Sequence, residues 1–152
     1  MKTLGNPQDK QLLLERVAKV RSDSTRAWGK MSPPQMISHL NDSFRLVSGE
    51  KQAGSVENIF SRTVMKWAAL SLPIAWPHGI RTMPELDQQV GGTQPAEFED
   101  DKRKLISLTE QFASKPGFLA TVRHPFFGKM SVEEWKRWAY LHMDHHLRQF
   151  HC

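Results

Sequence analysis

Three segments of this chain open with helix-start signals, and these signals constrain the fold more than any other feature. Asn6 stands directly before a proline, so a capping side chain precedes the residue type favoured at the first helical position. Ser32 with Gln35, and Ser131 with Glu134, have the spacing of a capping box, in which each side chain bonds the other residue's backbone N–H. We therefore expect helices that begin near residues 7, 33 and 132.

Apolar residues recur at helical spacing in five segments, which predict helices over residues 7–22, 33–48, 56–72, 95–114 and 132–150. The fourth of these is expected to end at Lys115-Pro116-Gly117. No segment alternates with period 2, so we expect no strands. The pattern predicts an all-α protein. The residues expected on the inner faces of the first four helices are Leu13, Leu14, Val17, Val20, Met36, Ile37, Leu40, Phe44, Val47, Phe60, Val64, Trp67, Ala68, Phe98, Leu105, Leu108 and Phe112.

Two links between these segments carry information about the architecture. Residues 73–94 are long and rich in proline and glycine, which is typical of a functional loop or of a crossover between distant elements. Residues 116–130 are apolar enough to pack across one end of a bundle. We expect a single domain over residues 1–152: a four-helix bundle with one long crossover and a short extra helix.

Composition excludes several classes of protein. The net charge is +5, but no basic arm or aromatic-interleaved basic patch accompanies it, so we expect no nucleic-acid partner. No apolar run approaches the roughly 20 residues of a membrane span, so we expect no membrane partner. The chain opens without an apolar leader, and Cys152 is its single cysteine, which rules out a disulfide framework or a cysteine-based zinc site. Both features favour the cytoplasm.

Histidines point to a candidate site. The chain has seven, and three crowd into HMDHHLRQF near its end. At 100° per residue, His142 and His146 fall within the inward arc of the last helix, together with Trp135, Trp138, Ala139 and Gln149. Because they are four residues apart, their rings project from successive turns and can converge on one metal ion. His39, at the edge of the apolar stripe of the helix expected over residues 33–48, supplies a third imidazole.

Alternatives remain open for these histidines. Without a metal, two buried rings can be polar core residues that hydrogen-bond to neighbouring helices. His145 follows His142 by three residues and lies just beyond the arc, so it can replace His146; we expect His146 to be the ligand and His145 to support a ligand or face the substrate. We expect His124 to be structural or at a pocket rim, and His78 and His151 to be exposed.

Three imidazoles with an open coordination position are typical of a reactive metal site, which activates water or polarises a substrate atom. Zinc, nickel and iron all suit such ligands. Of the residues nearby, His145 can act as a general acid or base, because imidazole titrates near neutrality. Gln149 can orient a ligand by a hydrogen bond. The sequence lacks the Glu-x-x-His pair of di-iron bundles, the His-Glu-x-x-His helix, the Gly-x-Ser-x-Gly elbow and a glycine-rich phosphate loop.

The segments WGKMSPPQMISHLNDSFR and HPFFGKMSVEEWKRWAYLHMDHHLRQF resemble the DinB superfamily of DinB-like and YfiT-like proteins. The intervening WPHGIRTMPELDQQVGGTQPAEFEDDKRKL is similar to one branch of it that is catalogued as a domain of unknown function. The likeness covers most of the chain, and its specific part is the two histidine-bearing segments.

This resemblance implies a four-helix bundle in which one histidine of the second helix and two of the last bind a divalent metal. The matching residues are His39, His142 and His146. Relatives include thiol-dependent transferases and isomerases that use low-molecular-weight thiols, and hydrolases; many form dimers. We therefore expect a metal-dependent transferase or hydrolase that acts on a small-molecule substrate, with His145 as its catalytic acid or base. A homodimer is a possible assembly. The alternative is a helical bundle that binds a metal or small ligand without catalysis.

Overall fold

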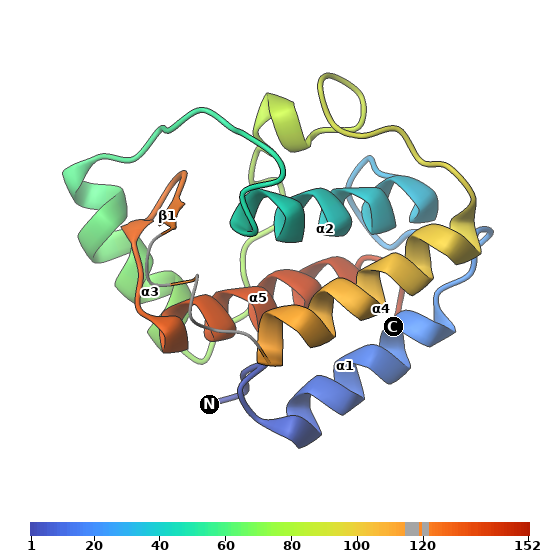
Figure 1. Ribbon diagram of the computed structural model, residues 1–152, viewed down its shortest axis with the longest axis horizontal. Coiled ribbons are helices and arrows are strands. Elements are labelled where there is room, and N and C mark those ends of the chain that lie inside the picture. The colour runs from blue at the N-terminus through green and yellow to red at the C-terminus, as the bar shows by residue number, and fades with distance from the viewer. Residues whose placement is uncertain (115–118, 120–121) are drawn as a thin grey trace.

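Helices make up most of the molecule, as the sequence predicts. The computed structural model describes residues 1–114, 119 and 122–152. Figure 1 shows α1 (Pro7–Lys19), α2 (Pro33–Val47), α4 (Phe98–Ser114) and α5 (Val132–Arg148) side by side. Helix α2 packs on α4, while α1 contacts both α4 and α5. These contacts confirm an all-α bundle.

Three helices begin at the capping residues that the sequence predicts. Ser32 accepts a hydrogen bond from the backbone N–H of Gln35, whose side chain accepts one from the Ser32 N–H. Ser131 and Glu134 make the same reciprocal pair at the start of α5. The Asn6 side chain accepts two backbone N–H groups at the start of α1. Since each cap satisfies donors that the first turn leaves unpaired, the sequence alone sets the starts of α1, α2 and α5.

Two predicted helix ends shift inward by three residues, and one lies outside the described residues. Helix α1 ends at Lys19 rather than Ser22, because Val20 takes an extended conformation and is fully buried there. Helix α4 begins at Phe98 rather than Pro95. Just before it, the Asp101 carboxylate accepts a hydrogen bond from the backbone N–H of Ala96. The predicted end at Lys115-Pro116-Gly117 lies outside the described residues.

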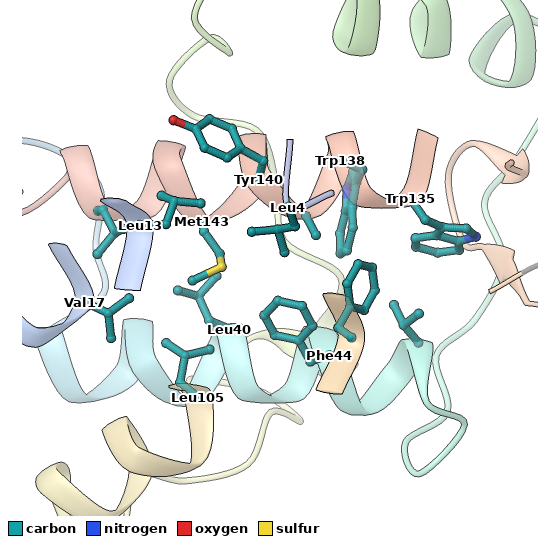
Figure 2. Packing of buried hydrophobic residues seen from close by; sticks show 14 of the residues in the cluster. Leu4, Leu13, Val17, Leu40, Phe44, Leu105, Trp135, Trp138, Tyr140 and Met143 are labelled. Atoms are coloured by element: carbon teal, nitrogen blue, oxygen red, sulfur yellow. The ribbon is translucent and has the colours of Figure 1, made fainter. Parts of the chain in front are cut away.

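The core fills the space between α5 and α2, as Figure 2 shows. Met143 and Trp138 of α5 lie opposite Leu40 and Phe44 of α2, and Leu105 of α4 closes the layer. The buried surface of α5 is broader than the predicted arc and includes Tyr140, Met143, His145 and Leu147. Helices α1 and α3 pack against α5 as well as the helix that carries His39, and loop side chains lie against His145.

The segment expected as a helix over residues 56–72 differs from its prediction. It contains a π-helical stretch, η1 (Ser61–Met65), followed by α3 (Lys66–Ser71). Phe60, Val64 and Trp67 were expected in the core and are 56%, 52% and 60% exposed. Ala68 is half-buried. The buried side chains are instead Ser61 and Leu70, because the segment lies at one end of the molecule and touches the bundle along a different face (Figure 1).

The expectation of no strands is wrong over a few residues. Strands β1 (Arg123–His124) and β2 (Gly128–Lys129) form an antiparallel pair that joins Arg123 to Lys129 and His124 to Gly128. Two residues per strand are too few to show a period-2 pattern in the sequence. Gly128 closes the hairpin with a φ of 67°, a conformation that most side chains disfavour.

The long link runs from α3 to α4, which agrees with the predicted crossover. It contains the short helix η2 (Pro84–Leu86) and lies across α2. Among the described residues, no helix combines the length and apolarity needed to cross a membrane.

Candidate metal centre

Helices α2 and α5 bring three histidine rings together at their interface. His39 lies mid-way along α2, and His142 and His146 lie one turn apart on α5. His39 is 3% and His146 7% exposed, while His142 is half-buried. The capping boxes set where each helix starts, and the apolar stripes then turn the three rings into the same interface. The structure therefore juxtaposes the residues expected as ligands.

The three rings converge through their Nε2 atoms. The His142 Nε2 lies 3.1 Å from the His39 Nε2 and 3.2 Å from the His146 Nε2. The ligand atoms of all three residues lie within 4.8 Å of one another. A tetrahedral zinc ion with Zn–N bonds of about 2.05 Å holds its nitrogens about 3.3 Å apart. The spacing therefore fits one ion held by three imidazoles.

Hydrogen bonds on the far side of two rings determine their tautomers. The His39 Nδ1–H donates to the Leu86 carbonyl at 2.8 Å, and the His146 Nδ1–H donates to the Gln149 Oε1 at 2.8 Å. In the neutral state each ring then has a lone pair on Nε2, directed at the other rings. The Nε2 of His142 can donate a proton to only one of them. Such a set of buried acceptors suits a cation.

Burial keeps these rings neutral. Desolvation is the main cause that lowers the pKa of His39, and it lowers the pKa of His142 and His146 well below the usual value. Mutual repulsion among the histidines lowers the pKa of His142 and His146 further. Neutral imidazole is the form that binds metals, so at neutral pH these residues are ready to act as ligands.

The Leu86 carbonyl belongs to the crossover, and a buried carboxylate holds that segment against α2. Asp42 is fully buried, one turn beyond His39. Its oxygens accept hydrogen bonds from the Thr93 N–H and the Thr93 hydroxyl, each at 2.7 Å, and Lys51 lies 3.2 Å away. Sequence reasoning missed Leu86 and Asp42. A backbone carbonyl leaves no residue-type signal, and Asp42 lies on the side of α2 opposite its apolar stripe, where an acidic residue is ordinary.

Gln149 in turn depends on the loop before α2. The Gln149 backbone carbonyl accepts the Ala27 N–H at 2.7 Å. Gly29 has a φ of 85°, and a Cβ there would lie 2.8 Å from the Gln149 Nε2. Only glycine combines this backbone conformation with room for the amide. The expected role of Gln149 in orienting a histidine agrees with its hydrogen bond to His146.

His145 lies beside the cluster and is not one of its members. It is 8% exposed, and its Nδ1 is buried without a hydrogen-bond partner in the described part of the chain. Its ring centroid lies 6.1 Å from Trp28, 6.2 Å from Trp76 and 6.4 Å from His78. The neighbours of His145 thus come from two loops. The metal-ligand geometry includes His146 and leaves His145 available for another role.

Indole rings surround the half-buried His142. Trp138 stacks on it with centroids 4.9 Å apart, and Trp76 lies 6.2 Å away. Trp28 of the loop before α2 stacks on His78 of the crossover at 4.0 Å and an interplanar angle of 12°. Loop tryptophans of this kind have no helical periodicity, so sequence reasoning did not place Trp28 or Trp76 here.

The remaining histidines behave as expected. The His124 Nδ1 accepts the backbone N–H groups of Phe126 and Phe127, each at 3.1 Å, so its role is structural. Burial lowers the pKa of His124 to about 3. His78 and His151 are exposed.

Comparison with known proteins identifies a family. The family model described as protein of unknown function (DUF1569) matches residues 8–152. No curated protein and no solved structure matches the chain.

Proposed function

The chain belongs to the DUF1569 family, and we propose that it binds a divalent metal ion through His39, His142 and His146 and uses it in catalysis. One observation carries this proposal: three buried Nε2 atoms meet at the spacing of metal ligands, and the hydrogen bonds to Leu86 and Gln149 direct two of the lone pairs at that point. The resemblance to the DinB superfamily, which selects the same trio, supports it. Three protein ligands leave room for a substrate atom.

The reaction class that fits best is a transfer to a thiol, or a hydrolysis. Zinc, nickel or iron held there would supply Lewis acidity that favours the deprotonated form of a thiol or water. The uncharged protein ligands leave the ion its full positive charge. The indole rings of Trp76 and Trp138 beside His142 limit the access of water.

Within this proposal, His145 is the general acid or base. Its Nδ1 lacks a partner, its ring centroid is 5.3 Å from that of His146, and it belongs to neither the core packing nor the ligand set. It can accept the proton of the nucleophile and return it to the leaving group.

Metal binding is tested by direct measurement. We expect purified protein to contain about one equivalent of a divalent ion, and stripped protein to rebind zinc with an affinity that His39→Ala lowers by at least 100-fold. His151→Asn is the matched control, because His151 is exposed and its positive φ of 59° is tolerated by asparagine. If His39→Ala and His151→Asn bind zinc as wild type does, the trio is not a metal site.

Catalysis is tested by a turnover screen that pairs several thiols, or water, with activated electrophiles. We expect wild type to turn over at least one pair and His142→Ala to lose that activity. His145→Gln should lower kcat by about 100-fold while zinc content stays unchanged. If a metal is retained and no pair reacts, the alternative of a non-enzymatic metal- or ligand-binding bundle stands. Equal turnover in wild type and His142→Ala contradicts the catalytic proposal.

A further inference from the structure

Exposed apolar side chains are concentrated in one stretch of the chain. Eleven large hydrophobic residues are exposed in the described structure, and eight of them belong to residues 56–80. The most exposed are Ile59 at 73%, Ile74 at 61%, Ile80 at 61% and Trp67 at 60%. We call residues 56–80 the apolar flank. Isolated surface hydrophobics are ordinary, but eight in one stretch of the chain, with tryptophan and phenylalanine among them, indicate an interaction surface.

The bundle leaves the exposed side chains of the apolar flank without a partner among the described residues. The flank is anchored through Leu70, whose carbonyl accepts the Arg137 side chain, and through Lys66, which pairs with Glu134 at 3.1 Å. In Figure 1, η1 and α3 lie at one end of the molecule beside the β hairpin, away from α1, α2 and α4. Phe60, Val64 and Trp67 recur at intervals of four and three residues, so they share the helix face that points away from the protein.

The charge of this surface selects its partner. Between Glu57 and Glu85 there is no acidic residue, whereas Arg62, Lys66 and Arg81 are basic. Among the residues that the structure describes, Arg62 and Arg81 make no ion pair. The exposed Lys129 of the hairpin adjoins this surface, because its carbonyl accepts the Lys66 ammonium at 3.1 Å.

A second copy of the chain matches this surface poorly. In a two-fold dimer the same patch meets itself, so the free cations of one copy would approach those of the other. The acids at hand, Glu57 and Glu134, already pair with Arg123 and Lys66. An anionic lipid surface matches both properties at once. Phosphate headgroups pair with arginine and lysine, and the aromatic and aliphatic side chains enter the boundary between headgroups and acyl chains.

We propose that the apolar flank binds the surface of anionic membranes, with Phe60 and Trp67 inserted at the interface and Arg62, Arg81 and Lys129 on the headgroups. The segment lies on the bilayer and does not cross it, in keeping with the lack of a membrane-spanning helix among the described residues. The expectation of no membrane partner came from the length of apolar runs, which concerns spanning alone. This proposal does not depend on the metal centre.

Vesicle co-sedimentation of the full chain tests the proposal. We expect binding to vesicles of phosphatidylcholine with phosphatidylglycerol, little binding to phosphatidylcholine alone, and a decrease as salt is raised. Phe60→Ser combined with Trp67→Ser should weaken binding at least tenfold. Arg62→Gln and Arg81→Gln should each weaken it about fivefold on anionic vesicles. All four positions are exposed, so circular dichroism should show an unchanged fold.

Matched controls come from exposed residues elsewhere. Leu12 is 52% exposed on α1, and Lys30 is exposed in the loop before α2, so Leu12→Ser and Lys30→Gln should bind vesicles as wild type does. Binding that is equal on neutral and anionic vesicles, or that survives the Phe60→Ser, Trp67→Ser change, overturns the proposal. The proposal is also overturned if the protein binds no vesicles and light scattering shows a dimer that the same double substitution dissociates. In that case the flank contacts a second copy of the chain.

Discussion

Gln149 connects the candidate metal centre to a loop far away in the sequence. Its amide oxygen orients His146, while its amide nitrogen occupies the space that the missing side chain of Gly29 leaves open. The orientation of a ligand ring thus rests on a backbone feature of the loop before α2. Partners of this kind typically change metal affinity by 10–100-fold when they are lost.

We predict that Gln149→Ala lowers zinc affinity by about 10- to 100-fold without unfolding the protein, because His146 loses the bond that holds its Nδ1 proton. Gly29→Ala should act in the same direction, since the added Cβ would lie 2.8 Å from the Gln149 Nε2. Competition with a chromogenic chelator measures both. Gly79→Ala is the control for a strained glycine, because its φ is 79° and no atom lies within 4 Å of the added Cβ. Wild-type affinity in Gln149→Ala would contradict the role given to this residue.

His124 makes stability depend on pH. Burial lowers the pKa of His124 to about 3, whereas an unfolded histidine has a pKa of about 6.5. The unfolded state therefore takes up a proton first as the pH falls. The stabilising contribution is complete above about pH 6.5 and is lost as the pH approaches 3. Between pH 7.5 and 5 this linkage removes about 2 kcal/mol of unfolding free energy.

We predict that His124→Asn reduces this pH dependence by about 2 kcal/mol, because asparagine can accept the same backbone N–H groups without titrating. Urea unfolding at pH 7.5 and 5, with a chelator present throughout, measures the effect. The exposed His151→Asn serves as the control and should keep the wild-type slope. An identical slope in His124→Asn would show that this ring is protonated in both states alike.

Among the elements, the crossover has the largest influence on the site. Residues 84–93 pack on α2, and Asp42 holds them there through Thr93 while Leu86 reaches His39. The buried carboxylate also lies close to the Lys51 ammonium, so its charge is compensated. Breaking a buried ionic contact costs more than the pair contributes, because one charge is left without a partner.

We predict that Asp42→Asn lowers the unfolding free energy by about 2–4 kcal/mol and weakens zinc binding, because the crossover is released from α2. Denaturant unfolding and the chelator competition measure the two effects. Asp23→Asn, at a carboxylate 68% exposed to solvent, should change neither. If Asp42→Asn lowers stability and leaves zinc affinity unchanged, the crossover does not control the metal centre.

At the scale of the whole molecule, an ion held by the proposed trio would couple α2 to α5. A ligand that binds only the folded state stabilises it by about 2.7 kcal/mol at 100 times its Kd. For a chain of this length that corresponds to a rise in Tm of about 5–10 °C. We predict this rise when zinc is added to stripped wild type, and its absence in His142→Ala. Differential scanning calorimetry measures it; a Tm independent of zinc in wild type would contradict a site between the helices.

Much of the architecture was predictable because it is encoded locally. The capping residues begin α1, α2 and α5, and the apolar stripes of α2 and α4 turn Leu40, Phe44 and Leu105 inward. For residues 56–72 the same reasoning predicted the wrong buried face. Its apolar stripe is real, yet the bundle covers a different face, and periodicity alone does not say which surface finds a partner.

The sequence by itself determined α1, α2, α4 and α5, where three of them begin, and that His142 and His146 share the inward face of α5. These properties depend on residues within one or two turns of each other, so local rules describe them. Only the tertiary structure decided that His39 meets those rings, that the Leu86 carbonyl and Gln149 hold the tautomers, and that Phe60 and Trp67 stay exposed. Each of these depends on which surfaces meet across the fold. That outcome is set by the packing of the entire chain.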